Sequence, residues 1–330
     1  MNILFSIIAI LVVILVAIVG VEIAHLNYLF GVVVPYTALV LFLSGIIYQV
    51  VRWARSPVPF RITTVAGQQK SLDWIKSNKL DSPHTTLGVV GRMFLEIVLF
   101  RSLFRNTKAE LKKGPTLVYG SSKYLWLGAL AFHWSFLIIF LRHFRYFVEP
   151  VPSFVSFLQN IDGFMQIGLP ILYITNIMIL IALIFLFLRR VIDPKLKYFS
   201  LVSDYFPLFL IIGIVITGIL MRYFTKVDIV NIKELAIGLF SFHPVIPDGI
   251  GIMFYIHLFL VCVLIAYFPY SKLLHMAGVF LSPTRNLANN NRMKRHINPW
   301  DYPVRIHPYE EYEDEFREKM KAAGIPLDKE

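Results

Sequence analysis

Long runs of uncharged, mostly apolar residues recur along this 330-residue chain and restrict what it can fold into. A helix needs about 20 such residues to cross the roughly 30 Å hydrocarbon layer of a bilayer. Open sheet cannot lie in lipid, because its edge backbone groups would have no hydrogen-bond partners. The sequence therefore predicts an all-α integral membrane bundle with about six transmembrane helices, at residues 3–21, 30–51, 124–141, 164–188, 206–221 and 249–271.

The first and fifth runs depart from the usual pattern of a span. Residues 3–21 have no basic segment before them and no small-residue cleavage motif after them, so we expect a retained span rather than a signal peptide. Residues 206–221 are too short to cross alone. We therefore expect this helix to extend into Tyr205 at one end or into 222–224 at the other.

Lysine and arginine are concentrated in alternate hydrophilic segments. Eleven lie in 53–122, four in 189–204 and ten in 270–330, against none in 22–34 and two in 225–248. Cytoplasmic loops of membrane proteins carry such an excess, so we predict a cytoplasmic C-terminus and an N-terminus outside. The net charge of +11 follows from this asymmetry. No nucleic-acid partner is expected, because the charge is spread over several loops of a membrane protein.

The spans and hydrophilic segments divide the chain into four parts. These are the first two transmembrane helices (1–52), a cytoplasmic loop with an interfacial helix (53–122), a four-helix bundle (123–281) and a cytoplasmic tail (282–330). Prolines and a glycine argue against one regular element at the start of the loop. The interfacial helix is expected at 87–104, where charges interrupt an apolar run. The tail ends in YEEYEDEFREKMKAAG, a segment of helical composition that either stays solvated or docks on a cytoplasmic partner.

The chain has one cysteine, Cys262, within the sixth apolar run. A single thiol can neither close an internal disulfide nor hold an iron–sulfur cluster. If electrons pass between this chain and such a cluster, a partner subunit must carry the cluster.

Four of the nine histidines lie in or next to two predicted spans. His133 and His143 are ten positions apart on the third span, and His257 and His275 are eighteen apart on the sixth, which runs in the opposite direction. At about 100° per residue, eighteen positions complete five turns, so His257 and His275 are expected on one face of a continuous helix. Depth pairs His143 with His257 on the outer side and His133 with His275 on the inner side. The two separations along the helix axes differ, at about 15 Å and about 27 Å.

Two imidazoles on opposing helices at similar depth can bind a haem iron on both of its faces. An iron with both axial positions filled has no open site for substrate and transfers electrons instead. Any one of these histidines alone would more simply be a core or interfacial side chain. Ionisable side chains inside spans are costly and usually functional, so four of them paired by depth favour haem.

Arg142 and Arg145 flank His143 at the predicted outer boundary. Two roles are open for them: binding a haem propionate or a quinone oxygen, or extending to lipid headgroups. The other histidines have no partner at a ligand-like spacing; they are His25, His84, His243, His296 and His307.

The ten- and eighteen-residue spacings, on two antiparallel spans in this order, resemble those of the NarI-like cytochrome b family, the gamma subunits of nitrate reductases. The resemblance covers roughly residues 120–280. It implies two haem b groups, the outer held by His143 and His257 and the inner by His133 and His275. It also implies quinol exchange near the outer haem.

An extra span, a long second loop and a long tail go beyond that pattern. These additions, and the stretch PFRITTVAGQQKSLDWIKSNKLDSPHTT, are similar to the DsrM (HmeC) family of cytochrome b subunits, from the membrane redox complex of dissimilatory sulfate and sulfite metabolism. The similarity implies electron transfer between menaquinol or menaquinone and a cytoplasmic iron–sulfur subunit like heterodisulfide reductase (DsrK-like). Further implied partners are an outer multihaem cytochrome c, an outer ferredoxin-like subunit and a second quinone-type membrane subunit.

Two other interpretations stay open. One is a cytochrome b subunit of a nitrate reductase or heterodisulfide reductase complex, and the other is a haem-free membrane anchor or transporter. Transporters often contain inverted repeats, and no internal repeat is apparent in this sequence. A reduced-minus-oxidised spectrum separates the two classes, because a b-type α band requires haem.

Overall fold

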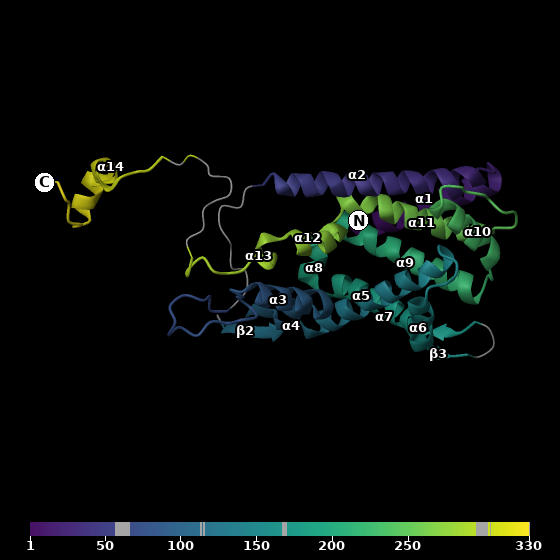
Figure 1. Ribbon diagram of the computed structural model, residues 1–330, viewed down its shortest axis with the longest axis horizontal. Helices are drawn as coiled ribbons and strands as arrows, with labels where there is room; N and C mark the ends of the chain where they lie inside the picture. The colour runs from purple at the N-terminus through teal and green to yellow at the C-terminus, as the bar shows by residue number, and fades with distance from the viewer. Residues whose placement is uncertain are drawn as a thin grey trace.

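The computed structural model describes residues 1–56, 67–112, 114, 116–166, 170–294, 303 and 305–329. Most of its helices run side by side in an elongated bundle (Figure 1). Within the described residues, six are long and apolar enough to cross a membrane: Asn2–Ile23, Leu29–Ala54, Lys123–Tyr146, Ile174–Ile192, Val202–Tyr223 and Ile252–Tyr270. The prediction of an all-α, multi-pass membrane protein with about six spans is therefore confirmed.

The first five spans are mostly regular α-helix, with π-helical or 3₁₀ turns at some of their ends. Their elements are α1 (Asn2–Ile18), η1 (Val19–Ile23), η2 (Leu29–Val33), α2 (Val34–Ala54), α5 (Lys123–His143), η3 (Phe144–Tyr146), α7 (Ile174–Ile192) and α9 (Val202–Tyr223). Shorter helices lie between successive spans from the third to the sixth: α6 (Ser153–Asp162), α8 (Pro194–Phe199) and α10 (Ile229–Phe240). The fifth span includes Tyr205 and Arg222, as its short apolar run required.

The fourth span begins at Ile174, later than the apolar run from 164 predicts. The preceding residues instead form two short antiparallel strands, β3 (Gly163–Met165) and β4 (Leu172–Tyr173). Pro170 lies between these strands; proline has no N–H and disfavours helical backbone in the residue before it. Residues 167–169 of the predicted span lie outside the described residues.

The sixth span does not continue as one helix to His275. Its elements are α11 (Ile252–Tyr267), the 3₁₀ turns η4 (Phe268–Tyr270) and η5 (Lys272–Leu274), and α12 (His275–Leu281). Pro269 cannot donate a helical hydrogen bond, and the Ser271 hydroxyl accepts from the Leu273 N–H at 3.1 Å to start the second turn. The prediction that His257 and His275 share one face of a continuous helix is therefore wrong.

Helix α2 packs directly on this break. A Cβ added at Gly45 would lie 2.7 Å from Cβ of Pro269, so the two backbones can approach this closely only because position 45 is glycine. One turn later, the Gln49 amide donates to the Pro269 carbonyl at 3.3 Å. The second span thus supports the break that precedes His275.

The bundle core lies among α1, α9 and α11, where Ile10, Leu210 and Leu260 are buried together. A second buried cluster joins α7 to α9 through Ile179 and Ile211. Burial of such side chains against one another stabilises the helix packing, while many other large apolar side chains stay exposed on the outside of the bundle. An exposed apolar exterior is what a bilayer requires.

The N-terminus lies at the basic end of the bundle. The Asn2 side chain donates to the Ser200 carbonyl at 3.0 Å, and Ser200 belongs to the basic segment 189–204. In Figure 1, α6 and α10 lie at one end of the bundle, and α8, α13 and β2 lie towards the other. Six crossings also return a chain to the side on which it began. With a cytoplasmic basic end, six crossings therefore predict a cytoplasmic N-terminus, on the same side as the C-terminus rather than opposite to it.

In its described residues, the loop between the second and third spans contains two helices and a hairpin. Its elements are α3 (Thr86–Leu99), α4 (Arg101–Arg105), β1 (Thr107–Lys112) and β2 (Thr116–Ser121). The helix predicted at 87–104 is divided in two because Phe100 has a φ of 49°, which is incompatible with a continuing helix. The indole N–H groups of Trp126 and Trp134 donate to the Leu99 and Val98 carbonyls at 2.7 and 3.1 Å, which attaches α3 to α5. Residues 57–66, at the irregular start of the loop, lie outside the described residues.

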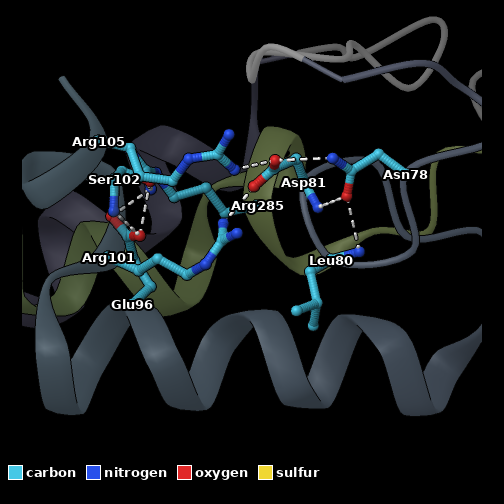
Figure 2. Close-up of polar contacts among 8 residues, drawn as sticks. All are labelled: Asn78, Leu80, Asp81, Glu96, Arg101, Ser102, Arg105 and Arg285. Atoms are coloured by element: carbon cyan, nitrogen blue, oxygen red, sulfur yellow. Dashed lines mark hydrogen bonds and ion pairs between the residues drawn. The ribbon is translucent and has the colours of Figure 1, made fainter. Parts of the chain in front are cut away.

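The tail contributes α13 (Pro283–Asn286) and α14 (Tyr309–Ala322), and α14 covers the charged segment predicted to be helical. Figure 2 shows how α13 joins the loop: the Arg285 guanidinium pairs with Glu96 of α3 at 2.5 Å. Beside this pair, the Asp81 carboxylate is buried and binds Arg101 and Arg105 of α4. Burial alone would raise the pKa of Asp81, but hydrogen bonds from the two guanidiniums outweigh it and hold the pKa below its ordinary value.

Candidate functional site

The structure brings His133 and His275 together at the basic end of the bundle. His133 lies in α5 and His275 is the first residue of α12, and their ring centroids are 6.0 Å apart with an interplanar angle of 86°. The ring centroids of Phe100, at the junction of α3 and α4, and of Phe132 each lie 5.0 Å from that of His133. The loop, α5 and α12 therefore meet around this histidine pair.

His143 and His257 form the second pair, nearer the opposite end of the bundle. His143 is the last residue of α5, and His257 lies in the second turn of α11. The two rings lie within electrostatic range of each other. The structure thus brings the rings of His133 and His275 together, and it places those of His143 and His257 within electrostatic range, across the antiparallel third and sixth spans.

All four histidines are held through Nδ1. His133, His143 and His275 bond to the main-chain carbonyls of Ala129, Ile139 and Lys272, at 2.7, 2.7 and 2.9 Å respectively. A carbonyl can only accept a hydrogen bond, so Nδ1 carries the proton in these three rings. In a neutral imidazole the other nitrogen, Nε2, then has a free lone pair. This is the tautomer in which a histidine binds a metal through Nε2.

Each of the four histidines keeps accessible surface. His143 and His275 are exposed, and His133 and His257 are partly exposed. Within the described residues, no group of three or more His, Cys, Asp or Glu side chains comes together as a metal site. Any metal centre built from these histidines must therefore take its remaining ligands from elsewhere, as an iron does when a porphyrin supplies four nitrogens.

Arg142 and Arg145 both lie within electrostatic range of His143, but their surroundings differ. Arg142 is buried and pairs with Asp162 of α6 at 3.2 Å. Its guanidinium also donates to Thr175 and Asn176 of α7 at 3.2 and 3.1 Å and lies 3.7 Å from the centre of the Tyr173 ring. The Arg145 side chain is partly exposed, 5.8 Å from the centre of the neighbouring Tyr146 ring. Arg145 thus has more freedom than Arg142 to reach a ligand.

Sequence reasoning missed two groups beside the second histidine pair. The Asp162 carboxylate neutralises Arg142 and accepts from the Thr175 hydroxyl at 2.6 Å. The Thr217 hydroxyl of α9 lies 2.9 Å from Nδ1 of His257. An arginine inside a span predicts a nearby carboxylate, so Asp162 could have been sought. Nothing in the sequence singles out Thr217.

Antiparallel spans that carry two histidine pairs in this order define a particular class of membrane protein. Residues 93–295 match the nitrate reductase gamma subunit family, and this range contains all four histidines. The chain belongs to this family, as the spacing of its histidines predicted. The first two spans lie before the matched range.

Two relatives extend the similarity to most of the chain. The Hdr-like menaquinol oxidoreductase cytochrome b-like subunit of Archaeoglobus fulgidus is 44% identical over 283 residues, which cover 84% of this chain and 84% of the relative. The subunit of the same name from Archaeoglobus profundus is 40% identical over 298 residues, which cover 88% of this chain and 86% of the relative.

Proposed function

We propose that this chain is the di-haem b membrane subunit of a quinone-linked oxidoreductase complex in dissimilatory sulfate and sulfite metabolism. It transfers electrons between menaquinol or menaquinone and a cytoplasmic iron–sulfur partner. His143 and His257 hold the outer haem, and His133 and His275 hold the inner haem. A haem with two imidazole ligands supplies one-electron exchange without binding substrate at the iron.

The spacing of the inner pair carries this proposal. Consider two imidazoles that bind one metal from opposite sides, each through a nitrogen about 2.0 Å from the metal. Each ring centre lies about 1.1 Å behind its nitrogen, so the two centroids are roughly 6 Å apart. His133 and His275 have a centroid separation of 6.0 Å. Both rings also hold their proton on Nδ1, which leaves Nε2 able to bind the iron. The residues present therefore fit the group that the family implies.

The quinone and the partners are proposed from the relatives and from the chain's own composition. Both relatives are named as subunits of an Hdr-like menaquinol oxidoreductase, which supports menaquinol and a heterodisulfide reductase-like (DsrK-like) partner here. Cys262 is the single cysteine, so iron–sulfur clusters belong to that partner. We assign Arg142 and Arg145 to an outer-haem propionate or a quinone oxygen. An outer multihaem cytochrome c, an outer ferredoxin-like subunit and a second quinone-type membrane subunit complete the proposed complex.

Haem stoichiometry tests the proposal. We expect pyridine haemochrome analysis of the membrane-embedded protein to give two b haems per chain. His143→Ala and His257→Ala should each remove one spectral component, and His133→Ala and His275→Ala should each remove the other, because each pair shares one iron.

His243 provides a matched control. Its Nδ1 also bonds to a main-chain carbonyl, that of Ser241 at 2.8 Å, but it belongs to neither histidine pair. His243→Ala should therefore keep both haems. Absence of haem from the intact protein would overturn the proposal, and loss of the same component in His143→Ala and His275→Ala would overturn the pairing.

A further inference from the structure

His257 differs from the other three histidines in how it is held. Each of the others bonds to a main-chain carbonyl three or four residues earlier in its own segment. Nδ1 of His257 instead lies 2.9 Å from the hydroxyl oxygen of Thr217, which belongs to a different helix, α9. The orientation of this ring is therefore tied to the packing of α9 against α11.

The hydrogen bonds around Thr217 determine where the protons lie. Its hydroxyl oxygen is 2.8 Å from the Gly213 carbonyl and 3.0 Å from the Ile214 carbonyl, and neither carbonyl can donate. The single hydroxyl hydrogen therefore points at these carbonyls, as in the common back-bonding of helical threonine. The Thr217 oxygen then accepts from His257, which places the imidazole proton on Nδ1 and leaves Nε2 free.

The next residue of α9 provides the space for the ring. A Cβ added at Gly218 would lie 3.3 Å from Cε1 of His257, tighter than an ordinary contact. Thr217 is itself buried, and its β-branched side chain has few rotamers in a helix. A stiff acceptor and an adjacent gap therefore fix both the proton position and the plane of the His257 imidazole.

We propose that Thr217 is a positioning residue for the outer haem, which sets the tautomer, plane and basicity of its ligand His257. This inference rests on the proposed function. A histidine that donates from its second nitrogen is a more basic ligand and favours the more highly charged state of a metal. Thr217 therefore stabilises the ferric state of the outer haem and lowers its midpoint potential relative to a haem without this bond.

Spectroscopic redox titration and low-temperature electron paramagnetic resonance of Thr217→Val and Thr217→Ser test the assignment. Valine keeps the shape of the side chain and removes the acceptor, whereas serine keeps the hydroxyl. At the wild-type midpoint of the outer haem, we expect the ferrous-to-ferric ratio to rise about fivefold in Thr217→Val, as for loss of a neutral hydrogen bond. Thr217→Ser should stay near wild type, and the inner haem should be unchanged in both.

Thr37→Val is the matched control, because the Thr37 hydroxyl makes the same back-bond, to Val33 at 2.8 Å, on the exposed side of α2. If Thr217→Val does not fold, Gly218→Ala keeps the hydroxyl, crowds the ring and should shift the ferric signal of the outer haem alone. An unshifted outer haem in Thr217→Val, or equal shifts in the valine and serine variants, would overturn the inference. Two haems in the wild type would leave the proposed function standing in that case, whereas a haem-free wild type would overturn the proposed function itself.

Discussion

Arg142 and Arg145 lie three positions apart at one end of α5, yet they have different energetic roles. Arg142 is 7% exposed and paired with the buried carboxylate of Asp162. Removing one partner of a buried ion pair costs about 3–5 kcal/mol, because the other charge stays buried without compensation. Arg145 is partly exposed and forms no ion pair with another described residue, so its removal leaves no buried charge among them unpaired.

We expect Arg145→Ala to slow haem reduction by quinol while both haems stay bound. Where bound quinone buries the contact, a polar contact contributes about 1–3 kcal/mol, or roughly 5- to 150-fold in affinity for the quinone. Arg142→Ala should slow the same step and also lower the thermal stability, because Asp162 loses its counter-charge. Stopped-flow reduction by a menaquinol analogue and a thermal melt separate the two effects.

Lys272→Ala is the control at the basic end of the bundle, where Lys272 pairs with Asp204 at 2.7 Å. It should leave quinol-driven reduction unchanged. If Lys272→Ala slowed reduction and both arginine variants did not, the quinone site would belong at the basic end.

At this scale, the sequence predicts the candidate ligands but not the groups that hold them. His133, His143, His257 and His275 are recognisable because an ionisable residue in a span is rare and because their spacing repeats on antiparallel helices. Thr217 has no such signal, and Asp162 is indicated only indirectly, by the need of Arg142 for a counter-charge. Their roles depend on which faces of α6, α7, α9 and α11 meet, and this is decided by packing.

Among the elements, the break between α11 and α12 explains how His275 reaches His133. On two straight helices, the two histidines of the third span would lie about 15 Å apart along the axis and those of the sixth about 27 Å apart, and these lengths do not match. The chain leaves the α-helical path at Phe268, so the longer value does not apply. Pro269 marks the break in the sequence, but the direction that the chain takes afterwards depends on contacts with α2 and α5.

We predict that Gly45→Leu on α2 selectively removes the inner haem. A side chain at this position would overlap Pro269, whose Cβ lies 2.7 Å from the Cβ position, and would displace the turns that lead to His275. Haem content per chain and the α band of each haem measure the effect, and the outer component should persist.

Val40→Leu serves as the control, because it places the same leucine side chain at a residue of the same helix that is 64% exposed. It should keep both haems. Retention of both haems in Gly45→Leu would show that α2 does not position His275, although it lies against the break.

For the whole molecule, we predict that both termini lie on the cytoplasmic side. The Asn2–Ser200 contact places the N-terminus beside a basic segment, and six spans return the chain to its starting side. Short epitope tags at the two termini should therefore both be protected from protease in intact cells and both be cleaved in inside-out vesicles. A third tag inserted at Lys226, in the segment between α9 and α10, should give the opposite result.

Cleavage of the N-terminal tag alone in intact cells would mean that one of the six apolar helices does not cross.

Composition predicts the number of spans because each needs a long apolar run. It does not predict the β1–β2 hairpin, whose turn contains Gly114 with a φ of 87°, because such short strands resemble ordinary polar loop sequence.

The way the histidines are held also determines which mutations can release them. Every residue has a main-chain carbonyl, so no amino-acid replacement at Ala129, Ile139 or Lys272 can delete the acceptor of the ring that it holds. Three of the four rings thus keep their hydrogen-bond acceptor whatever codon change occurs at the acceptor position. His257 alone of the four bonds through Nδ1 to a side chain, and a single codon change at Thr217 removes this hydroxyl without touching the histidine, while the Ile214 main chain stays beside the ring.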